Sequence, residues 1–246
     1  LNISSGNIDS ENINATTIDI SGGTVLGTTI GADNITMSGG TVLGESMQIT
    51  TVHDMQLNGG LLQADALRLT SEQGTIKQLY GVNGGRVYVG HLYIKANKAS
   101  SNVVTVDLGS QYNKLSNIFI THGTKGNIAI GSGNDVAGDL RISVLNGASG
   151  AGQLLGSLTV HNYANGAANQ LLVNDNLQAS GDITLINDEA NIEIGTDGTG
   201  IATKLTASNI TLKSKYDVVH DGGNITASDK VALFTDGNIL LEGRSL

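Results

Sequence analysis

Short segments in which two apolar residues flank one polar or small residue recur along most of the chain. Examples are "TIDISGG" (17–23), "NITMSGG" (34–40) and "DMQLNGG" (54–60). Because side chains alternate between the two faces of a strand, both apolar residues of a segment point to the same side. Gly, Asn or Asp ends almost every segment, and helical periodicity is nearly absent. The pattern predicts an all-β chain of short strands joined by tight turns.

The phrase "SGGTVLG" occurs twice, at 21–27 and at 38–44. The spacing of the repeated segments gives a period of roughly 17 to 20 residues, which is too short for a strand–helix–strand unit. A β-sandwich would not repeat a phrase, and the signature of leucine-rich repeats is missing. The repeat therefore predicts a parallel β-helix with about 17–22 residues per coil, which gives about 12 coils for 246 residues.

A single coil cannot bury its own apolar face, so successive coils must stack and place like residues above one another. We expect Gly22 and Gly23 to lie over Gly39 and Gly40, at corners where a side chain would clash. The predicted stacked positions are Ile18, Ile20, Gly22, Gly23, Val25, Ile35, Met37, Gly39, Gly40, Val42, Met55 and Leu57.

The recurrence of these strand segments along the chain predicts one solenoid over residues 1–246. Coils are expected to be regular in about 1–94 and 177–246, and looser with longer loops in about 95–176. Such insertions are often the binding face of a solenoid. The chain begins with Leu and shows no signal peptide, so we expect it to be a segment of a longer chain.

Composition and charge exclude several classes of function. The net charge of −9 argues against nucleic acid as a partner, because phosphate binding needs a basic surface. The absence of cysteine excludes disulfides and thiolate metal sites. No run of about 18 apolar residues is present, so no helical membrane span is expected. No Lys or Arg precedes Arg68, and that part of the chain carries the acids Asp9, Glu11, Asp19, Asp33, Glu45, Asp54 and Asp65.

Two clusters are candidate sites of chemistry or binding. Neighbouring coils could bring carboxylates together as in a glycosidase, although acids in solvent-facing turns are the simpler interpretation. Three tyrosines form the one aromatic cluster, and either filling of the core or a modest binding surface would explain them. The acids are Asp182, Asp188, Glu189 and Glu193, and the tyrosines are Tyr80, Tyr88 and Tyr93.

No cofactor and no transition metal is assigned, because the five histidines show no metal-binding spacing. Gly- and Asp-rich turns such as "GTDGTG" (195–200) offer oxygen ligands that suit calcium. The known calcium nonapeptide is not matched, which favours ordinary turns. The weak calcium candidates are Asp135, Asp139, Asp197 and Asp221.

Four segments resemble the passenger repeats of filamentous-haemagglutinin-like exoproteins. They are "GDITL" (181–185), "NITL" (209–212), "GNITAS" (223–228) and "DGNILLEG" (236–243). Those adhesins are exported by two-partner secretion or as autotransporters. The resemblance implies a right-handed parallel β-helix that is secreted or displayed at the bacterial cell surface. No proline is present, so the proline-containing motifs of the two-partner secretion domain are missing.

These observations predict a non-enzymatic structural and adhesive shaft of an extracellular exoprotein or filament. Its expected partner is a ligand on a host or neighbouring cell, or further copies of itself. Two alternatives stay open. One is a carbohydrate-active β-helix enzyme, either a lyase or a glycosidase, and the other is a subunit of a self-assembling extracellular fibre.

Overall fold

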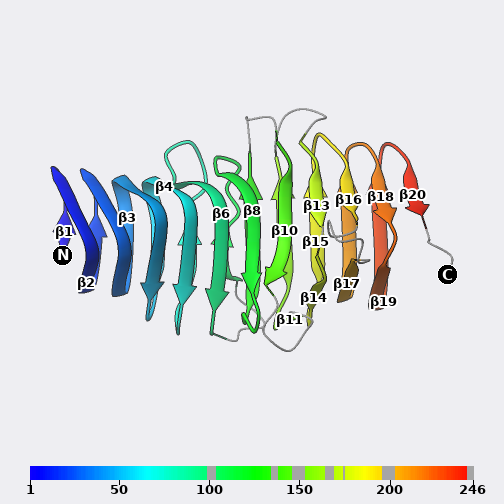
Figure 1. Ribbon diagram of the computed structural model, residues 1–246, viewed down its shortest axis with the longest axis horizontal. Coiled ribbons are helices and arrows are strands. Elements are labelled where there is room, and N and C mark those ends of the chain that lie inside the picture. Colours follow the sequence, from blue (N-terminus) through cyan, green and yellow to red (C-terminus); the bar gives the residue numbers. More distant parts are fainter. Residues whose placement is uncertain are drawn as a thin grey trace.

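The computed structural model describes residues 1–98, 104–133, 138–145, 153–163, 169–173, 175–195 and 203–242. It is all-β, and its strands form one long parallel sheet that is not closed into a barrel. The strands lie side by side along one long axis, with the two termini at opposite ends (Figure 1). The predicted parallel β-solenoid is confirmed. Within the described residues there is no helix that is long and apolar enough to cross a membrane.

The strand pairings among the described residues are all parallel, and each joins one coil to the next. The strands are β1 (Asn2–Ile3), β2 (Asn7–Ile20), β3 (Thr24–Thr51), β4 (Met55–Ser71), β5 (Ile76–Gln78), β6 (Arg86–Ala96), β7 (Val104–Leu108), β8 (Lys114–Thr121), β9 (Asn127–Ser132), β10 (Leu140–Leu145), β11 (Gln153–Leu154), β12 (Leu158–Asn162), β13 (Leu171–Val173), β14 (Leu177–Ala179), β15 (Ile183–Asn187), β16 (Ile192–Ile194), β17 (Lys204–Ser214), β18 (Val218–Asp221), β19 (Asn224–Thr235) and β20 (Ile239–Glu242).

Coil length varies more than the sequence predicts. Asn2 pairs with Asp19, at the spacing expected from the repeated phrase. Leu140 pairs with Leu171, so this coil is almost twice as long as the first. The predicted range of coil lengths is therefore too narrow, because loops are inserted at the corners between strands while the strand pairing is kept. One such loop, residues 79–85, lies between β5 and β6.

One column of inward-facing residues runs the length of the molecule. Among the described residues it has eleven levels, fewer than the twelve coils predicted, because the longer coils use more residues per level. Ten of the levels are aliphatic or Met, which fits a narrow interior that is packed by like residues. Gln78 is the polar exception, and it is buried. The column is Ile3, Ile20, Met37, Leu57, Gln78, Leu108, Ile130, Val160, Leu185, Leu212 and Leu233.

The glycines of the repeated phrase stack at one corner. Gly23 and Gly40 have φ angles of 73° and 71°, in the left-handed region that favours glycine. A Cβ on Gly40 would lie 2.7 Å from the carbonyl oxygen of Gly22 in the coil below. The Thr41 N–H donates to the Gly23 carbonyl at 3.0 Å, a bond that sets Val42 above Val25. Any side chain at Gly40 would therefore push the two coils apart.

The cross-section of the solenoid changes about halfway along its length. We call the row of segments 7–10, 24–27, 41–44, 61–64 and 86–89 the first face. It continues to Lys114 and Leu115, beyond which no described residue pairs with it. Towards the C-terminus the coils have a different additional row of strands. This row follows β10, β13, β16 and β18 along the chain and consists of β11, β14, β17 and β19. A corner of stacked polar residues takes the place of the first face, namely Ser132, Asn162, Asn187 and Ser214.

The register can be tested at Ile35, which lies over Ile18 and is 3% exposed. We expect Ile35→Asp to lower the free energy of unfolding by about 3 kcal/mol or more, because it buries an unpaired charge. Thr17→Asp is the matched control, because Thr17 is exposed and faces outward from the same coil pair. Urea titration measures both variants. Equal stability of the two would contradict the inward assignment.

The pH dependence of stability can be tested at His220, which lies in a second column, in register with Ile194 on one neighbouring coil and Leu241 on the other. It is 8% exposed, and its Nε2 has no hydrogen-bond partner among the described residues. Burial lowers the pKa of His220, and nearby Asp221 only partly offsets this. As pH falls through about 6.5, the unfolded chain takes up a proton before the folded chain does, so stability should fall.

His220→Leu should remove this part of the pH dependence, since leucine suits the aliphatic column. The measurement is urea unfolding between about pH 7.5 and about pH 5.5, a window chosen around the ordinary pKa of histidine. His53→Gln is the control, because His53 is exposed. A parent and a His220→Leu variant with the same loss of stability across this window would contradict the account.

Candidate functional site

A groove lies on the outer surface at the point where the first face ends. Its cavity is about 320 Å³. Its walls are formed by strands β6 and β8, the turn before β8, and the residues that directly follow β9 and β12. We call it the cationic–aromatic groove, and its lining residues are Arg86, Tyr88, Gln111, Tyr112, Lys114, Gly133 and Tyr163.

Strand alternation directs the first side chains into this groove. Val87 and Val89 are buried in the core, so Arg86 and Tyr88 face outward from the same strand. Lys114 lies in register with Tyr88 on the next coil, and its Nζ is 5.2 Å from the centre of the Tyr88 ring. Such a stacked pair of cation and ring is a cation–π contact.

Arg86 makes a second contact of this kind, with the turn that precedes β8. Its guanidinium carbon lies 5.9 Å from the centre of the Tyr112 ring. The charged groups of both cations therefore lie over aromatic rings at the groove wall. Both basic groups lie on the outer surface of a protein with a net charge of −9.

A buried polar junction fixes the wall from inside. The Asn113 side chain is fully buried, and its Oδ1 accepts the Val87 N–H at 3.0 Å. Its Nδ2 donates to the carbonyl oxygens of Leu108, at 2.8 Å, and Gly131. Gln78 donates to the Gly85 carbonyl at 2.7 Å and is also hydrogen-bonded to Asn113. Buried amides that satisfy one another in this way hold a loop in one conformation.

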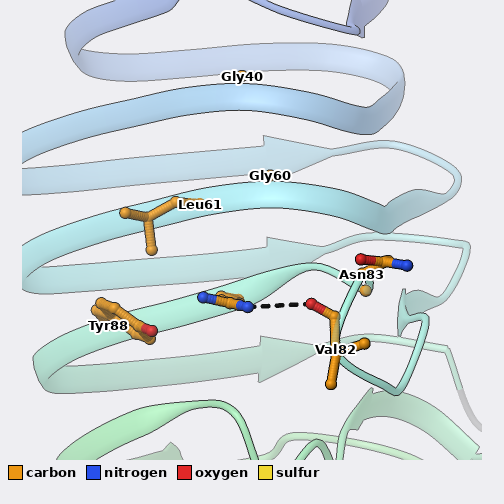
Figure 2. A pocket seen from close by; sticks show the side chains of 8 residues that line it. Gly40, Gly60, Leu61, Val82, Asn83 and Tyr88 are labelled. Carbon is orange, nitrogen blue, oxygen red and sulfur yellow. Dashed lines mark hydrogen bonds between the residues drawn. The ribbon is translucent and has the colours of Figure 1, made fainter.

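A second hollow of about 310 Å³ adjoins the groove, because Arg86 and Tyr88 line both. Figure 2 shows Gly40 and Gly60 on successive coils beside Leu61, with Val82 and Asn83 on the loop opposite. The dashed line marks the Arg86 guanidinium donating to the Val82 carbonyl at 3.0 Å. Together the two hollows form a trough that crosses several coils.

A histidine–carboxylate pair lies beside the groove. The Tyr163 ring stacks on His161 with the ring centres 3.6 Å apart. His161 Nε2 lies 2.8 Å from the Asp188 carboxylate. Burial raises the pKa of Tyr163, and the charge of Asp188 raises it further. A histidine oriented by a carboxylate is an arrangement that can move protons.

The structure separates the three tyrosines that the sequence grouped. Only Tyr88 lines the groove. Tyr93 stacks on Phe119 with ring centres 4.7 Å apart, below Arg68 at 5.2 Å. Tyr80 donates its hydroxyl to Asp107, and its pKa is raised well above the usual range by burial and by this carboxylate.

The four carboxylates do not form one cluster. Asp182 precedes β15 and Asp188 follows it, so a strand of five residues, about 16 Å long, separates them. A glycosidase needs its two carboxylates within about 5–9.5 Å of each other. Asp182 instead accepts the backbone N–H of Asn209 at 3.1 Å and its side-chain N–H at 2.8 Å. Glu189 lies in the bend after β15, and Glu193 is partly exposed on β16.

Two of the calcium candidates, Asp135 and Asp197, lie outside the described residues. Asp139 accepts the Gln170 N–H at 3.3 Å and lies 3.4 Å from the Arg141 guanidinium. Asp221 ends β18. In the described part of the chain, no three His, Asp or Glu side chains gather as metal ligands would.

The acidic start of the chain forms its own hollow at another corner. Its cavity, about 670 Å³, is lined by Asp9, Glu11, Glu45 and Asp65, with Gly27 and Gly44 among the residues between them. The acidic hollow and the cationic–aromatic groove therefore lie on different coils of the same rod, whereas Leu61 of the adjoining hollow and Asp65 of the acidic hollow lie on the same strand.

Comparison of the chain with family models, with curated proteins and with solved structures finds no match. Function must therefore be argued from the geometry of this chain.

Proposed function

We propose that this chain is a non-enzymatic shaft segment of an extracellular bacterial exoprotein or filament, and that it presents a binding surface away from the cell. The resemblance of its repeats to those of haemagglutinin-like exoproteins supports an extracellular location. Its partner is a ligand on a host or neighbouring cell. The mechanism is mechanical, because a stiff rod holds the binding groove at a fixed distance and orientation.

The observation that carries this proposal is the inward column that passes through eleven coils, from Ile3 to Leu233. Each coil depends on its neighbours for its hydrogen bonds and its core, so the rod resists bending at any single level. The groove lies on the side of this rod, at the step in its cross-section. A rod that carries such a groove on its side suits presentation and attachment.

Catalysis on carbohydrate is the second candidate, and the His161–Asp188 pair favours it. The pair lies behind Tyr163, which itself lines the groove. The shaft is preferred because a glycosidase would also need a second carboxylate at a short distance from the first. Asp182 lies at the far end of the strand from Asp188.

Assembly into fibres is the third candidate. The last described strands expose several large apolar side chains, among them Phe234, Leu240 and Leu241. Another coil or another copy would cover such an edge. Fibre growth would appear as concentration-dependent sedimentation of the purified chain.

The shaft and enzyme hypotheses differ in what the acids do. We expect the combined variant Asp182→Asn, Asp188→Asn, Glu189→Gln and Glu193→Gln to attach to cells as the parent does. Ile118→Asp should abolish attachment, because Ile118 is fully buried and its coil would open. Attachment to mammalian and bacterial cells is measured by flow cytometry with labelled protein.

The same preparations are incubated with neutral and acidic polysaccharides, and new reducing ends and unsaturated products are measured. The shaft hypothesis predicts no cleavage by the parent or by the amide variant. Cleavage by the parent that disappears in the amide variant would establish the enzyme and overturn the shaft.

A further inference from the structure

We propose that Asn83 is a site of spontaneous deamidation in the folded chain, with water as the co-reactant. Asn83 lies in the loop 79–85 between β5 and β6, and its side chain is exposed. The modification is independent of the proposed shaft function, because it needs only the folded chain and solvent. It introduces a carboxylate into a hollow that Arg86 also lines.

The reaction starts at the backbone nitrogen of Gly84, the residue after Asn83. This nitrogen loses its proton to hydroxide and attacks Cγ of Asn83. The bond from Cγ to the side-chain nitrogen breaks, and ammonia leaves with a proton taken from water. Water then adds to one of the two carbonyl carbons of the resulting succinimide ring, which opens to aspartate or to isoaspartate. Glycine favours the ring closure, because it has no Cβ that would hinder the attacking nitrogen.

The described part of the chain contains the same reactive triplet twice. Asn-Gly-Gly occupies 58–60 and again 83–85. The side chains of Asn58 and Asn83 are both exposed, and each asparagine is followed by two glycines, so their intrinsic chemistry is closely matched. A large difference in rate that appears only in the folded chain must therefore come from the backbone around each residue.

The backbone around Asn58 is held by the preceding coil. Gly59 is buried and in register with Ser38, and a Cβ on Gly59 would lie 2.4 Å from the Ser38 carbonyl oxygen. Gly60 is fixed in the left-handed region, with a φ angle of 79°. The Asn58 amide itself donates to Gln56 Oε1 at 3.3 Å. The Gly59 nitrogen can reach Cγ of Asn58 only if the two coils move apart, and stacked coils resist this.

Asn83 lies instead in a turn that is closed within its own loop. The Gly84 N–H donates to the Gly81 carbonyl at 3.0 Å, and the backbone atoms that approach Gly84 most closely belong to the same loop. The Arg86 guanidinium donates to the Val82 carbonyl at 3.0 Å. Neither bond is a strand pairing, so the turn can open locally while the ladder stays intact. Ring closure at Asn83 therefore requires the opening of one turn rather than the separation of two coils.

The reaction changes the charge of the hollow beside the loop. Asn83 and Val82 face this hollow from the loop, as Figure 2 shows, and Arg86 is part of the same lining. The amide is neutral, whereas aspartate and isoaspartate are negative at neutral pH. A carboxylate next to a guanidinium can accept charge-assisted hydrogen bonds from it. The electrostatic character of this hollow therefore changes with the age of the protein.

The test is peptide mapping by mass spectrometry after the whole chain has been incubated in ¹⁸O-labelled water at mildly alkaline pH. Digestion in ordinary water follows. Trypsin releases Asn83 in the peptide 78–86, and endoproteinase Asp-N releases Asn58 in the peptide 54–64. The urea-unfolded chain is treated in the same way. Mapping is needed because Asn-Gly also occurs at 146–147 and 165–166, outside the described residues.

In the folded chain we expect Asn83 to take up label about tenfold or more faster than Asn58, because a loop opens locally more often than a paired strand does. Isoaspartate should accompany aspartate, since both form from the succinimide, and the rate should rise with pH. In the unfolded chain the two rates should become similar. Asn83→Gln is the control variant and should take up no label at this position, because glutamine would have to close a less favourable six-membered ring.

The inference is overturned if Asn83 takes up label no faster than Asn58 in the folded chain. It is equally overturned if the preference for Asn83 is as large in the unfolded chain, because the fold then does not select the site. Label at Asn83 without isoaspartate would show direct hydrolysis of the amide and would refute the succinimide route. Equal labelling of the Asn83→Gln variant at this position would refute it as well.

Discussion

The in-register hydrogen-bond ladder between successive coils governs the rest of this structure. Every parallel strand takes its hydrogen bonds from the coil before and the coil after, so the chain is free to vary only where strands are joined. The same constraint sets the interior, because residues at one position of the coil become neighbours in one column. Aliphatic residues and Met fill that column, and glycine is required at corners such as Gly40 where two coils approach closely.

The groove is a consequence of a change in that ladder. The first face ends at Lys114 and Leu115, and buried Asn113 and Gln78 satisfy the backbone groups exposed at this step. Outside the same step, Arg86, Lys114 and three tyrosines gather on a surface that no further strand covers among the described residues. The end of the first face thus provides both the shape and the side chains of the candidate site, while the regular coils make the rod stiff.

The sequence predicts the fold and the early register well because a phrase repeats at the spacing of the first coils, where Asn2 pairs with Asp19 and Asp19 with Thr36. Ile18 lies over Ile35 as expected. It predicts coil length poorly, since the loop 79–85 lengthens a coil without altering its strands. The groove could not be predicted from the spacing of its residues in the sequence, because Arg86, Tyr112 and Tyr163 lie on separate coils. One feature of the sequence could have pointed to this region. Gln78 is polar at a position of the inward column that is aliphatic or Met at the other levels. Asp182 and Asp188 were grouped as candidate residues because they are close in sequence, but they lie at opposite ends of one strand.

The central claim is that successive coils rise by one strand spacing in the predicted register, and spin-label distances test it directly because the chain has no cysteine of its own. Asp19 and Thr159 are six levels apart in one outward column, and Thr36 and Thr159 are five. Labels at the first pair should be about 29 Å apart and at the second about 24 Å, each with a narrow distribution. Distances that are broad, or that do not shorten by about one strand spacing between the two pairs, would contradict the stacked solenoid.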